Sequence, residues 1–273
     1  KLKEYYFSET VIEKTLTLDT SNFRVYAKGR DFQDNRLAYK LKLVGGYNPA
    51  KLQSIQNFID NNLQKSSLPL NLLSMINAKY IISPQKFNTK ALELIGYDKS
   101  TKNWLYQNPY NLGVAYWNKK IIPLNNAAEV MSKLNNPSYS PADSVYIMSD
   151  SVKGTIFNLE SDASIDVKTY EPNKIILTTS NAQNGFLTLS EVFYPVGWKC
   201  TIDGKETEIY QTNYILRGIF VPAGEHEIKF EFEPKSYFIG NSLVYFGILL
   251  SYLAVILGIW ISFKREKSSV NDK

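Results

Sequence analysis

The most apolar part of the chain is a continuous stretch near its C-terminal end. Residues 238–263 contain no Asp, Glu, Lys or Arg. As an α-helix this stretch would be about 39 Å long, because each residue adds about 1.5 Å. The hydrocarbon core of a bilayer is roughly 30 Å thick, so we predict that residues 237–263 form a transmembrane helix.

Aromatic and basic residues flank this stretch in the way expected of a membrane span. Tyr237 and Trp260 lie near its two ends, where membrane proteins concentrate aromatic side chains. Lys264-Arg265-Glu266-Lys267 follows directly. Because positively charged segments stay on the cytoplasmic side, we expect residues 264–273 to be a cytoplasmic tail and residues 1–236 to be extracytoplasmic.

Small residues recur at a spacing of seven along the same stretch, at Gly240, Gly247 and Ala254. Such a stripe lets a second transmembrane helix approach closely, and a single anchor does not need it. The pattern therefore favours the last helix of a multi-spanning protein, with upstream transmembrane helices of the same protein as its partners.

Residues 1–150 mix two periodicities and predict a mixed α/β lobe. Polar and apolar residues alternate over 10–18, and a second short strand is expected over 23–26. After a glycine-rich turn, apolar residues recur at helical spacing, with Asn48 as the expected N-cap and Pro49 in the first turn. The other expected elements are helices over 70–76 and 126–134 and strands over 79–82, 114–117, 120–123 and 145–148.

Residues 151–236 have the pattern of an antiparallel β-sandwich of immunoglobulin or jelly-roll type. Turn residues separate short strands, and the Asp203-Gly204 pair is a strong two-residue hairpin signal. The expected strands cover 154–160, 163–170, 173–180, 185–193, 198–202, 206–210, 213–221 and 226–233. We therefore expect an α+β protein with a mixed lobe, a β-sandwich domain, one transmembrane helix and a tail.

The charge and composition of the chain argue against a nucleic acid as its binding partner. The chain has 31 Lys and Arg against 26 Asp and Glu, which gives a net charge of +5. No basic stripe with interleaved stacking aromatic residues is present, so we expect no nucleic-acid partner. We interpret the local group of Arg24, Lys28 and Arg30 as the solvated face of a strand.

The chain has one cysteine and one histidine, which excludes an internal disulfide and a Cys/His zinc cluster. We therefore expect no metal and no cofactor. His226 is expected to be an exposed strand residue, because nothing near it in sequence supplies a nucleophile and an orienting acid. Cys200 alternates with Trp198 and Ile202, so we expect it to be a small buried hydrophobic residue.

One candidate binding site surrounds the glycine-rich turn. The Gly45-Gly46 pair precedes the expected helix N-terminus and could present backbone N–H groups to a phosphate. Arg36, Lys42 and Lys51 are near in sequence and could pair with a pyrophosphate. The alternative is a turn whose glycines only permit the path of the backbone. The candidate substrate-binding residues here are Arg36, Gly45, Gly46, Tyr47 and Lys51.

A second candidate site is aromatic. Tyr194, Trp198 and Tyr214 could stack on the apolar face of a sugar ring. The alternative is that they belong to the sandwich core, like the buried tryptophan of immunoglobulin domains. Pro195 and Gly197 suggest a bulge or bent edge beside the tryptophan, which would leave it accessible. Tyr194 and Trp198 are therefore candidate substrate-binding residues as well.

Several segments, taken in order, resemble a known family. They are Asn35-Arg36 with Tyr39, and residues 45–52, 70–82, 108–116, 193–198, 203–205 and 221–226. In this order, followed by a helix after Pro234, they resemble the C-terminal part of the bacterial YfhO-type membrane proteins. The composition, rich in Lys, Asn and Ile, is similar to that of members from Bacteroidota.

The resemblance implies a polytopic protein of the bacterial cytoplasmic membrane with a GT-C-like fold. Such proteins are thought to transfer sugars from polyprenyl-phosphate donors to cell-envelope acceptors on the extracytoplasmic face. The catalytic acid of GT-C enzymes usually lies in the first extracytoplasmic loop, which we expect to precede this chain, so no catalytic residue is assigned. The implied partners are membrane lipid, a polyprenyl-phosphate-linked sugar or envelope glycan, and the upstream helices.

Two other functions are compatible with the same sequence. One is a membrane-anchored carbohydrate-binding or adhesion module. In that case the reading frame directly upstream of this chain would encode a signal peptide. A glycosyltransferase of the implied kind would have many hydrophobic spans there instead. The other is a structural envelope protein whose catalytic residues have decayed.

Overall fold

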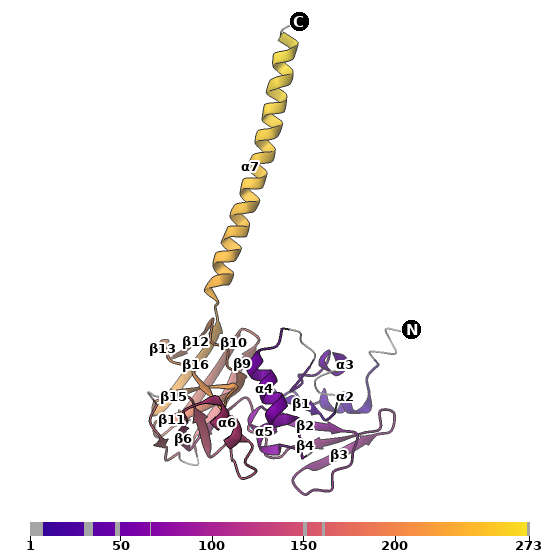
Figure 1. The fold of residues 1–273 in the computed structure, drawn as a ribbon, viewed down its shortest axis with the longest axis vertical. Coiled ribbons are helices and arrows are strands. Elements are labelled where there is room, and N and C mark those ends of the chain that lie inside the picture. The colour runs from indigo at the N-terminus through magenta and orange to yellow at the C-terminus, as the bar shows by residue number, and fades with distance from the viewer. Residues whose placement is uncertain are drawn as a thin grey trace. The chain divides into compact units, whose positions relative to one another are not determined.

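The structure is a computed structural model, drawn in Figure 1, and it describes residues 8–29, 35–46, 50–65, 67–149, 152–159 and 162–271. Its side chains are described as far as residue 261. The chain forms two compact units. The first comprises Lys1–Phe193 and Lys199–Phe230, and the second comprises Tyr194–Trp198 and Glu231–Lys273.

Among its described residues, the first unit contains short helices and three sheets. The helices are α2 (Val11–Leu16), α3 (Asn35–Ala38), α4 (Gln53–Phe58), which continues as the π-helix η1 (Ile59–Leu63), α5 (Leu70–Met75) and α6 (Ala127–Leu134). One sheet of four strands has the order β1-β2-β4-β3. Its strands are β1 (Arg24–Ala27), β2 (Ala78–Ser83), β3 (Glu93–Asp98) and β4 (Asn103–Gln107).

The seven-stranded sheet has the order β5-β11-β15-β14-β7-β6-β8. Its strands are β5 (Ala115–Asn118), β6 (Lys120–Pro123), β7 (Ser144–Ile147), β8 (Thr155–Ile156), β11 (Gly185–Val192), β14 (Tyr210–Thr212) and β15 (Leu216–Val221). Strands from both sides of residue 150, the expected domain boundary, therefore share one sheet.

The five-stranded sheet has the order β13-β12-β16-β10-β9. Its strands are β9 (Ser164–Glu171), β10 (Lys174–Asn181), β12 (Trp198–Ile202), β13 (Lys205–Thr207) and β16 (Gly224–Phe232). The Asp203-Gly204 pair joins β12 to β13 as expected, with Ile202 paired to Lys205 and positive φ at both turn residues. The prediction of an α+β protein, rich in antiparallel strands, is confirmed.

The segment over 10–18 is a helix and not the predicted strand. Thr10 caps α2, because its side chain accepts a hydrogen bond from the backbone of Glu13 at 3.2 Å. The Glu13 carboxylate in turn accepts from the Thr10 backbone N–H at 2.8 Å. This reciprocal capping box satisfies two N–H groups that a helix start otherwise leaves without partners, and it outweighs the short alternating pattern.

The structure differs from the sequence prediction in two further respects, the start of α4 and the presence of β3 and β4. Helix α4 begins at Gln53, with Leu52 at the N-cap, and not at the expected Asn48-Pro49. Asn48 and Pro49 lie outside the described residues. Strands β3 and β4 were not predicted at all. Most of β3 is exposed, including Leu94 and Ile95, so it lacks the alternation that marks a half-buried strand.

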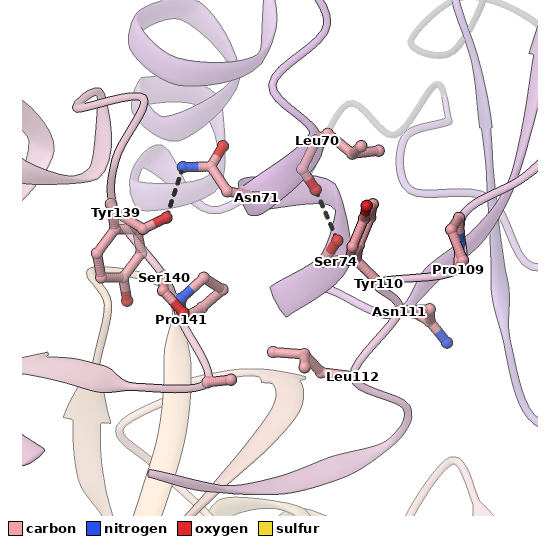
Figure 2. A pocket seen from close by; sticks show the side chains of 11 residues that line it. Leu70, Asn71, Ser74, Pro109, Tyr110, Asn111, Leu112, Tyr139, Ser140 and Pro141 are labelled. Carbon is pink, nitrogen blue, oxygen red and sulfur yellow. Dashed lines mark hydrogen bonds between the residues drawn. The ribbon is translucent and has the colours of Figure 1, made fainter. Parts of the chain in front are cut away.

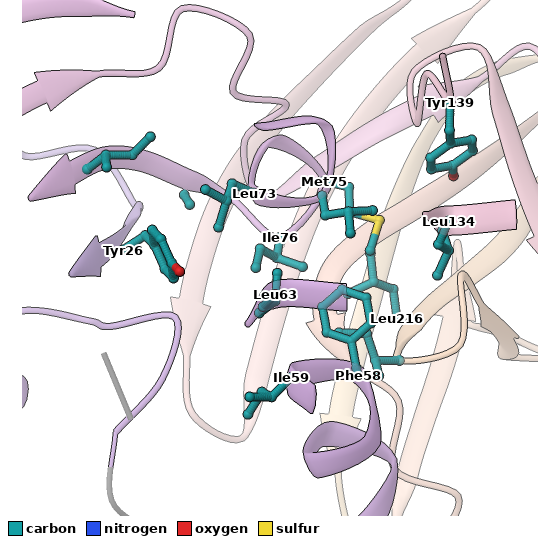
Figure 3. Close-up of a cluster of buried hydrophobic side chains, with 14 of the residues drawn as sticks. Tyr26, Phe58, Ile59, Leu63, Leu73, Met75, Ile76, Leu134, Tyr139 and Leu216 are labelled. Atoms are coloured by element: carbon teal, nitrogen blue, oxygen red, sulfur yellow. The ribbon is translucent and has the colours of Figure 1, made fainter. Parts of the chain in front are cut away.

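The main hydrophobic core of the first unit combines residues from its N-terminal helices and strands with Leu216 of β15 (Figure 3). Phe58 and Leu63 from α4 and η1 meet Leu73 and Met75 of α5 in this cluster, and Leu216 of β15 packs among them. All of these side chains are buried. The cluster positions α5, which forms one wall of the candidate site described below.

The second unit is dominated by α7 (Lys235–Asn271). Its residues Lys235–Ile261 are long and apolar enough to cross a membrane, and none of them is buried within the described structure. Ser242 and Ser251 donate their hydroxyl hydrogens to the carbonyls of Phe238 and Gly247, each at 2.9 Å. These polar groups therefore have partners within the helix, as a lipid environment requires.

Candidate functional site

The candidate site is an open pocket of roughly 450 Å³ in the first unit (Figure 2). Three segments form its walls: the start of α5, the loop after β4 and the loop after α6. The lining residues are Leu70, Asn71, Ser74, Pro109, Tyr110, Asn111, Leu112, Tyr139, Ser140, Pro141 and Ala142. The volume lies within the range of about 300–1,000 Å³ that is typical of ligand pockets.

Hydrogen bonds hold the three walls together. The Asn71 side chain donates to the carbonyl of Tyr139 at 3.3 Å, which Figure 2 shows as a dashed line across the pocket. The Leu112 N–H donates to the carbonyl of Ser74 at 3.2 Å. The buried amide of Asn108 donates to the Ser74 hydroxyl at 3.0 Å and to the Ala78 carbonyl at 3.1 Å. The pocket is therefore preformed, because its walls depend on buried contacts.

The lining combines one exposed ring with amide and hydroxyl groups. Tyr110 exposes 59% of its surface. Asn111 donates from its Nδ2 to Asn77 at 3.0 Å, while its buried Oδ1 has no hydrogen-bond partner among the described residues. Such groups suit a neutral ligand that carries hydroxyls, since each hydroxyl can both donate and accept.

The described lining residues include no carboxylate, histidine, cysteine, lysine or arginine. Tyr139 is buried, and its hydroxyl lies 3.0 Å from two acceptors, the carbonyl oxygen of Ser144 and Oδ1 of Asn213. Burial raises the pKa of Tyr139 well above its ordinary value. The pocket lining can therefore bind a ligand by hydrogen bonds and ring contacts, but it supplies no group that exchanges a proton near neutral pH.

A separate charged cluster joins the four-stranded sheet to the seven-stranded sheet. Arg24 of β1 donates from Nη1 to the carbonyls of Ser190, at 2.6 Å, and Ile76, at 3.0 Å. Its Nη2 lies 2.6 Å from Glu191 Oε1, and both side chains are only 18% exposed. The Tyr170 hydroxyl also donates to Glu191. The interpretation of Arg24 as part of a solvated strand face is therefore wrong, because its guanidinium lies between two sheets.

Electrostatics in this cluster follow from burial and from Glu191. Burial alone would lower the pKa of Arg24, but Glu191 and Tyr170 raise it above its ordinary value. Burial lowers the pKa of Arg217 to about 10, against the opposing effect of Glu191. Burial also lowers the pKa of Lys42, whose ammonium lies 4.2 Å from the centre of the Tyr170 ring. Glu191 thus pairs directly with Arg24 and also stabilises the charged forms of Arg217 and Lys42.

The candidate residues around the glycine turn bind different partners. Arg36 Nη1 lies 2.6 Å from Glu13 Oε1 in α2, and its Nη2 donates to the Ser8 carbonyl at 2.8 Å. Lys51 donates to Gln56 at 3.2 Å. Gly46 has a φ of +121°, and the helix that was expected to follow the Gly45-Gly46 pair starts only at Gln53.

Tyr47 lies outside the described residues. The assignment of these residues to phosphate binding stays a prediction.

The candidate aromatic residues divide between the two units. In the second unit, the ring centres of Tyr194 and Trp198 lie 6.2 Å and 5.4 Å from that of Phe232. In the first unit, the Tyr214 hydroxyl accepts a hydrogen bond from Asn57 at 3.0 Å, and its ring packs against the main core. Tyr214 is thus partly buried at the edge of that core.

His226 and Cys200 have structural roles. The Nδ1 of His226 lies 2.6 Å from Asp203 Oδ2, and its Nε2 lies 3.2 Å from the Ala223 carbonyl. With a side chain only 15% exposed, His226 is not the exposed histidine that was expected. Cys200 is buried as predicted, and burial raises the pKa of its thiol to about 12, which makes it unreactive.

Sequence reasoning did not identify the pocket residues as a site. Two of the three walls come from the segments 70–82 and 108–116, which were noticed only for their resemblance to a family. The run Asn108-Pro109-Tyr110-Asn111 was the available signal, because it combines an aromatic ring and amides with the Asn-Pro pair that is typical of a turn.

A β-rich unit followed by a long apolar helix fits a membrane-associated class of protein. Comparison with protein families makes this specific, because residues 155–244 match the family described as bacterial membrane protein YfhO. The matched stretch runs from β8 into α7, and the match supports a YfhO-type membrane protein region, as the resemblance predicted. Comparisons with curated proteins and with solved structures gave no match.

Proposed function

We propose that the chain is the extracytoplasmic C-terminal region of a polytopic membrane glycosyltransferase that uses polyprenyl-phosphate-linked sugars to modify the cell envelope. In this proposal the region binds a sugar or glycan and does not itself catalyse transfer. The observation that carries the proposal is the uncharged pocket between α5 and the two loops, in a chain whose residues 155–244 match a membrane protein family.

The chemistry of the pocket supports a glycan as its ligand. Tyr110 offers an exposed ring on which an apolar sugar face can stack. Asn111 and Asn71 offer amide groups for hydroxyls, and the buried Asn111 Oδ1 lacks a partner that a ligand hydroxyl would supply. A phosphate would gain little here, since the described lining has no cationic side chain.

The location follows from the same proposal. Residues 1–236 would lie on the extracytoplasmic face of the cytoplasmic membrane, α7 would cross the bilayer, and residues 264–273 would be cytoplasmic. This orientation rests on the cluster of basic residues that follows the apolar stretch. In this proposal the pocket would lie on the side of the membrane where envelope glycans are assembled.

The test uses the full-length protein in its own membrane. Tyr110→Ala and Asn111→Ala should each weaken binding of oligosaccharides released from the envelope of the producing bacterium by about tenfold, as expected for the loss of about 1.4 kcal/mol. Tyr97→Ala, at an exposed tyrosine outside the pocket, is the matched control. Binding unchanged in both pocket variants would refute a role of the pocket in glycan binding.

A membrane-anchored carbohydrate-binding or adhesion module is the second candidate, because a pocket without proton-transfer groups suits binding alone. Deletion of the full gene separates the two functions. Altered composition of the envelope glycan, with cell adhesion intact, supports the glycosyltransferase. Unchanged glycan together with lost attachment of the cells to a glycan-coated surface supports the adhesion module.

A further inference from the structure

A short loop belongs to the same compact unit as the apolar helix. Residues 194–198, which we call the juxtamembrane loop although Trp198 is also the first residue of β12, group with Glu231–Lys273 and not with the rest of β12 or with β11. The loop contains no charged residue. Its structure can therefore be considered together with the base of α7.

Backbone and ring contacts fix the juxtamembrane loop immediately before the helix. The Glu233 N–H donates to the Gly197 carbonyl at 2.6 Å. The Phe232 ring contacts the rings of Tyr194 and Trp198, at centre-to-centre distances of 6.2 Å and 5.4 Å. The loop is thus attached at residues 232–234, one residue before α7 begins.

Gly197 makes this attachment possible. Its φ of +91° lies in the region that favours glycine. A Cβ added there would lie 2.8 Å from the Phe232 ring and 3.0 Å from Pro234. The backbone of the loop therefore lies in direct contact with the residues that lead into the helix, and no larger side chain has space at this position.

The length of the helix sets the depth of this contact. Lys235–Ile261 comprises 27 residues, which as a helix span about 40 Å. The hydrocarbon core takes roughly 30 Å, and the headgroup layer adds about 5–7 Å on each side. About 5 Å of helix therefore lies within each headgroup layer, and Pro234, directly before Lys235, lies at that level or just outside it.

The side chains of the loop suit this depth. Val196 exposes 56% of its surface and Tyr194 exposes 41%. Tyrosine and tryptophan have an apolar ring and a polar group, which is why they concentrate at membrane interfaces. Tyr237, 64% exposed on the first turn of α7, adds a further ring at the same end.

We infer that the juxtamembrane loop lies in the headgroup layer of the bilayer, where Tyr194, Val196 and Trp198 contact lipid. The inference rests on the membrane-spanning helix of the proposed function. It deepens that proposal, because it assigns the lipid surface as the partner of Tyr194 and Trp198, which the sequence alone suggests as residues that stack on a sugar.

The experiment measures the depth of Val196 in the full-length protein, reconstituted in vesicles of phosphatidylethanolamine and phosphatidylglycerol. An environment-sensitive fluorophore is attached to Val196→Cys in a Cys200→Ala background. Lipids that carry a nitroxide in the headgroup should quench its emission several-fold more strongly than that of the same fluorophore at Lys90→Cys, an exposed residue of the first unit. Iodide dissolved in the aqueous phase should quench the Lys90 probe more strongly than the Val196 probe.

A third probe at Leu249→Cys, in the middle of the apolar helix, separates the two proposals. One outcome is that acyl-chain nitroxides quench the Leu249 probe while the Val196 probe responds like the Lys90 probe. This outcome would overturn the inference about the loop and leave the proposed membrane helix intact. If the Leu249 probe is also accessible to iodide, the membrane location in the proposed function fails as well. Strong headgroup quenching at Val196 supports the inference.

Discussion

The hydrogen bond between His226 and Asp203 is the clearest titratable contact at the scale of single residues. It joins the β12–β13 turn to β16, because Asp203 also accepts from the Glu227 N–H at 2.9 Å. The Asp203 hydrogen bond raises the pKa of His226 above its ordinary value of 6.5. The same bond lowers the pKa of Asp203.

The two shifts predict a window of pH in which this contact stabilises the fold. The contribution of His226 is complete below the pKa of an unfolded histidine and is lost as pH rises through its raised pKa. That of Asp203 is present above the pKa of an unfolded aspartate, 3.8, and is lost as pH falls through its lowered pKa. We therefore expect the contact to stabilise between roughly pH 4 and pH 6.5 and to weaken on both sides.

Because the chain has one histidine, NMR of the labelled imidazole reads this pKa directly. We predict that Asp203→Asn moves the midpoint of the His226 titration down toward 6.5, its ordinary value. Glu225→Gln is the control, since it removes a neighbouring carboxylate and leaves the Asp203 hydrogen bond in place. An identical shift in both variants would contradict the assignment of the raised pKa to Asp203.

At the scale of elements, Arg24 connects β1 to the strand β11 of another sheet. Its guanidinium binds two backbone carbonyls and Glu191, and its side chain and that of Glu191 are each 18% exposed. Removal of the arginine would leave a largely buried carboxylate without its main cationic partner. We predict that Arg24→Ala lowers the free energy of unfolding by about 3–5 kcal/mol.

Lys119→Ala provides the comparison for this prediction. Lys119 pairs with Asp143 at 2.8 Å, but their side chains are 65% and 57% exposed. An exposed pair contributes at most about 1 kcal/mol. Denaturant unfolding of the purified full-length chain, followed by tryptophan fluorescence, measures both variants. Equal losses in the two variants would show that Arg24 does not join the sheets energetically.

The sequence correctly predicted several helices and strands whose ends are marked by a clear local pattern, such as an N-cap residue or a turn pair. Asn126 was expected to begin a helix, and it caps α6 by accepting from the Glu129 N–H at 2.9 Å. The helix α2 was missed because six residues are too few for a helical period to outweigh an apparent alternation. The Thr10-x-x-Glu13 capping box was nevertheless visible in the sequence, so the error lay in weighting two local signals.

At the scale of the whole molecule, the direction in which α7 crosses the membrane decides which compartment the pocket faces. The basic residues after the apolar stretch favour a cytoplasmic C-terminus. We predict that green fluorescent protein fused after Lys273 is fluorescent and that alkaline phosphatase fused there is inactive. The same reporters placed before residue 8 of the chain should give the opposite result, and a reversed pattern would refute the orientation.

The sequence by itself determined the features that depend on neighbouring residues. The uncharged stretch specifies an apolar helix, the Asp203-Gly204 pair specifies a hairpin, and alternation places Cys200 in the core. These outcomes need only local backbone preferences or the side of a strand on which a residue lies.

Only the tertiary structure decided the features that depend on residues far apart in the chain. Arg24 is buried because Glu191 and the Ser190 carbonyl lie opposite it, and a pattern around residue 24 contains no information about them. The pocket forms where three segments far apart in sequence meet, and Asn71 donates to the carbonyl of Tyr139 across two of them. Such contacts require the folded core that brings the segments together, since burial and partners are properties of packing and not of local sequence.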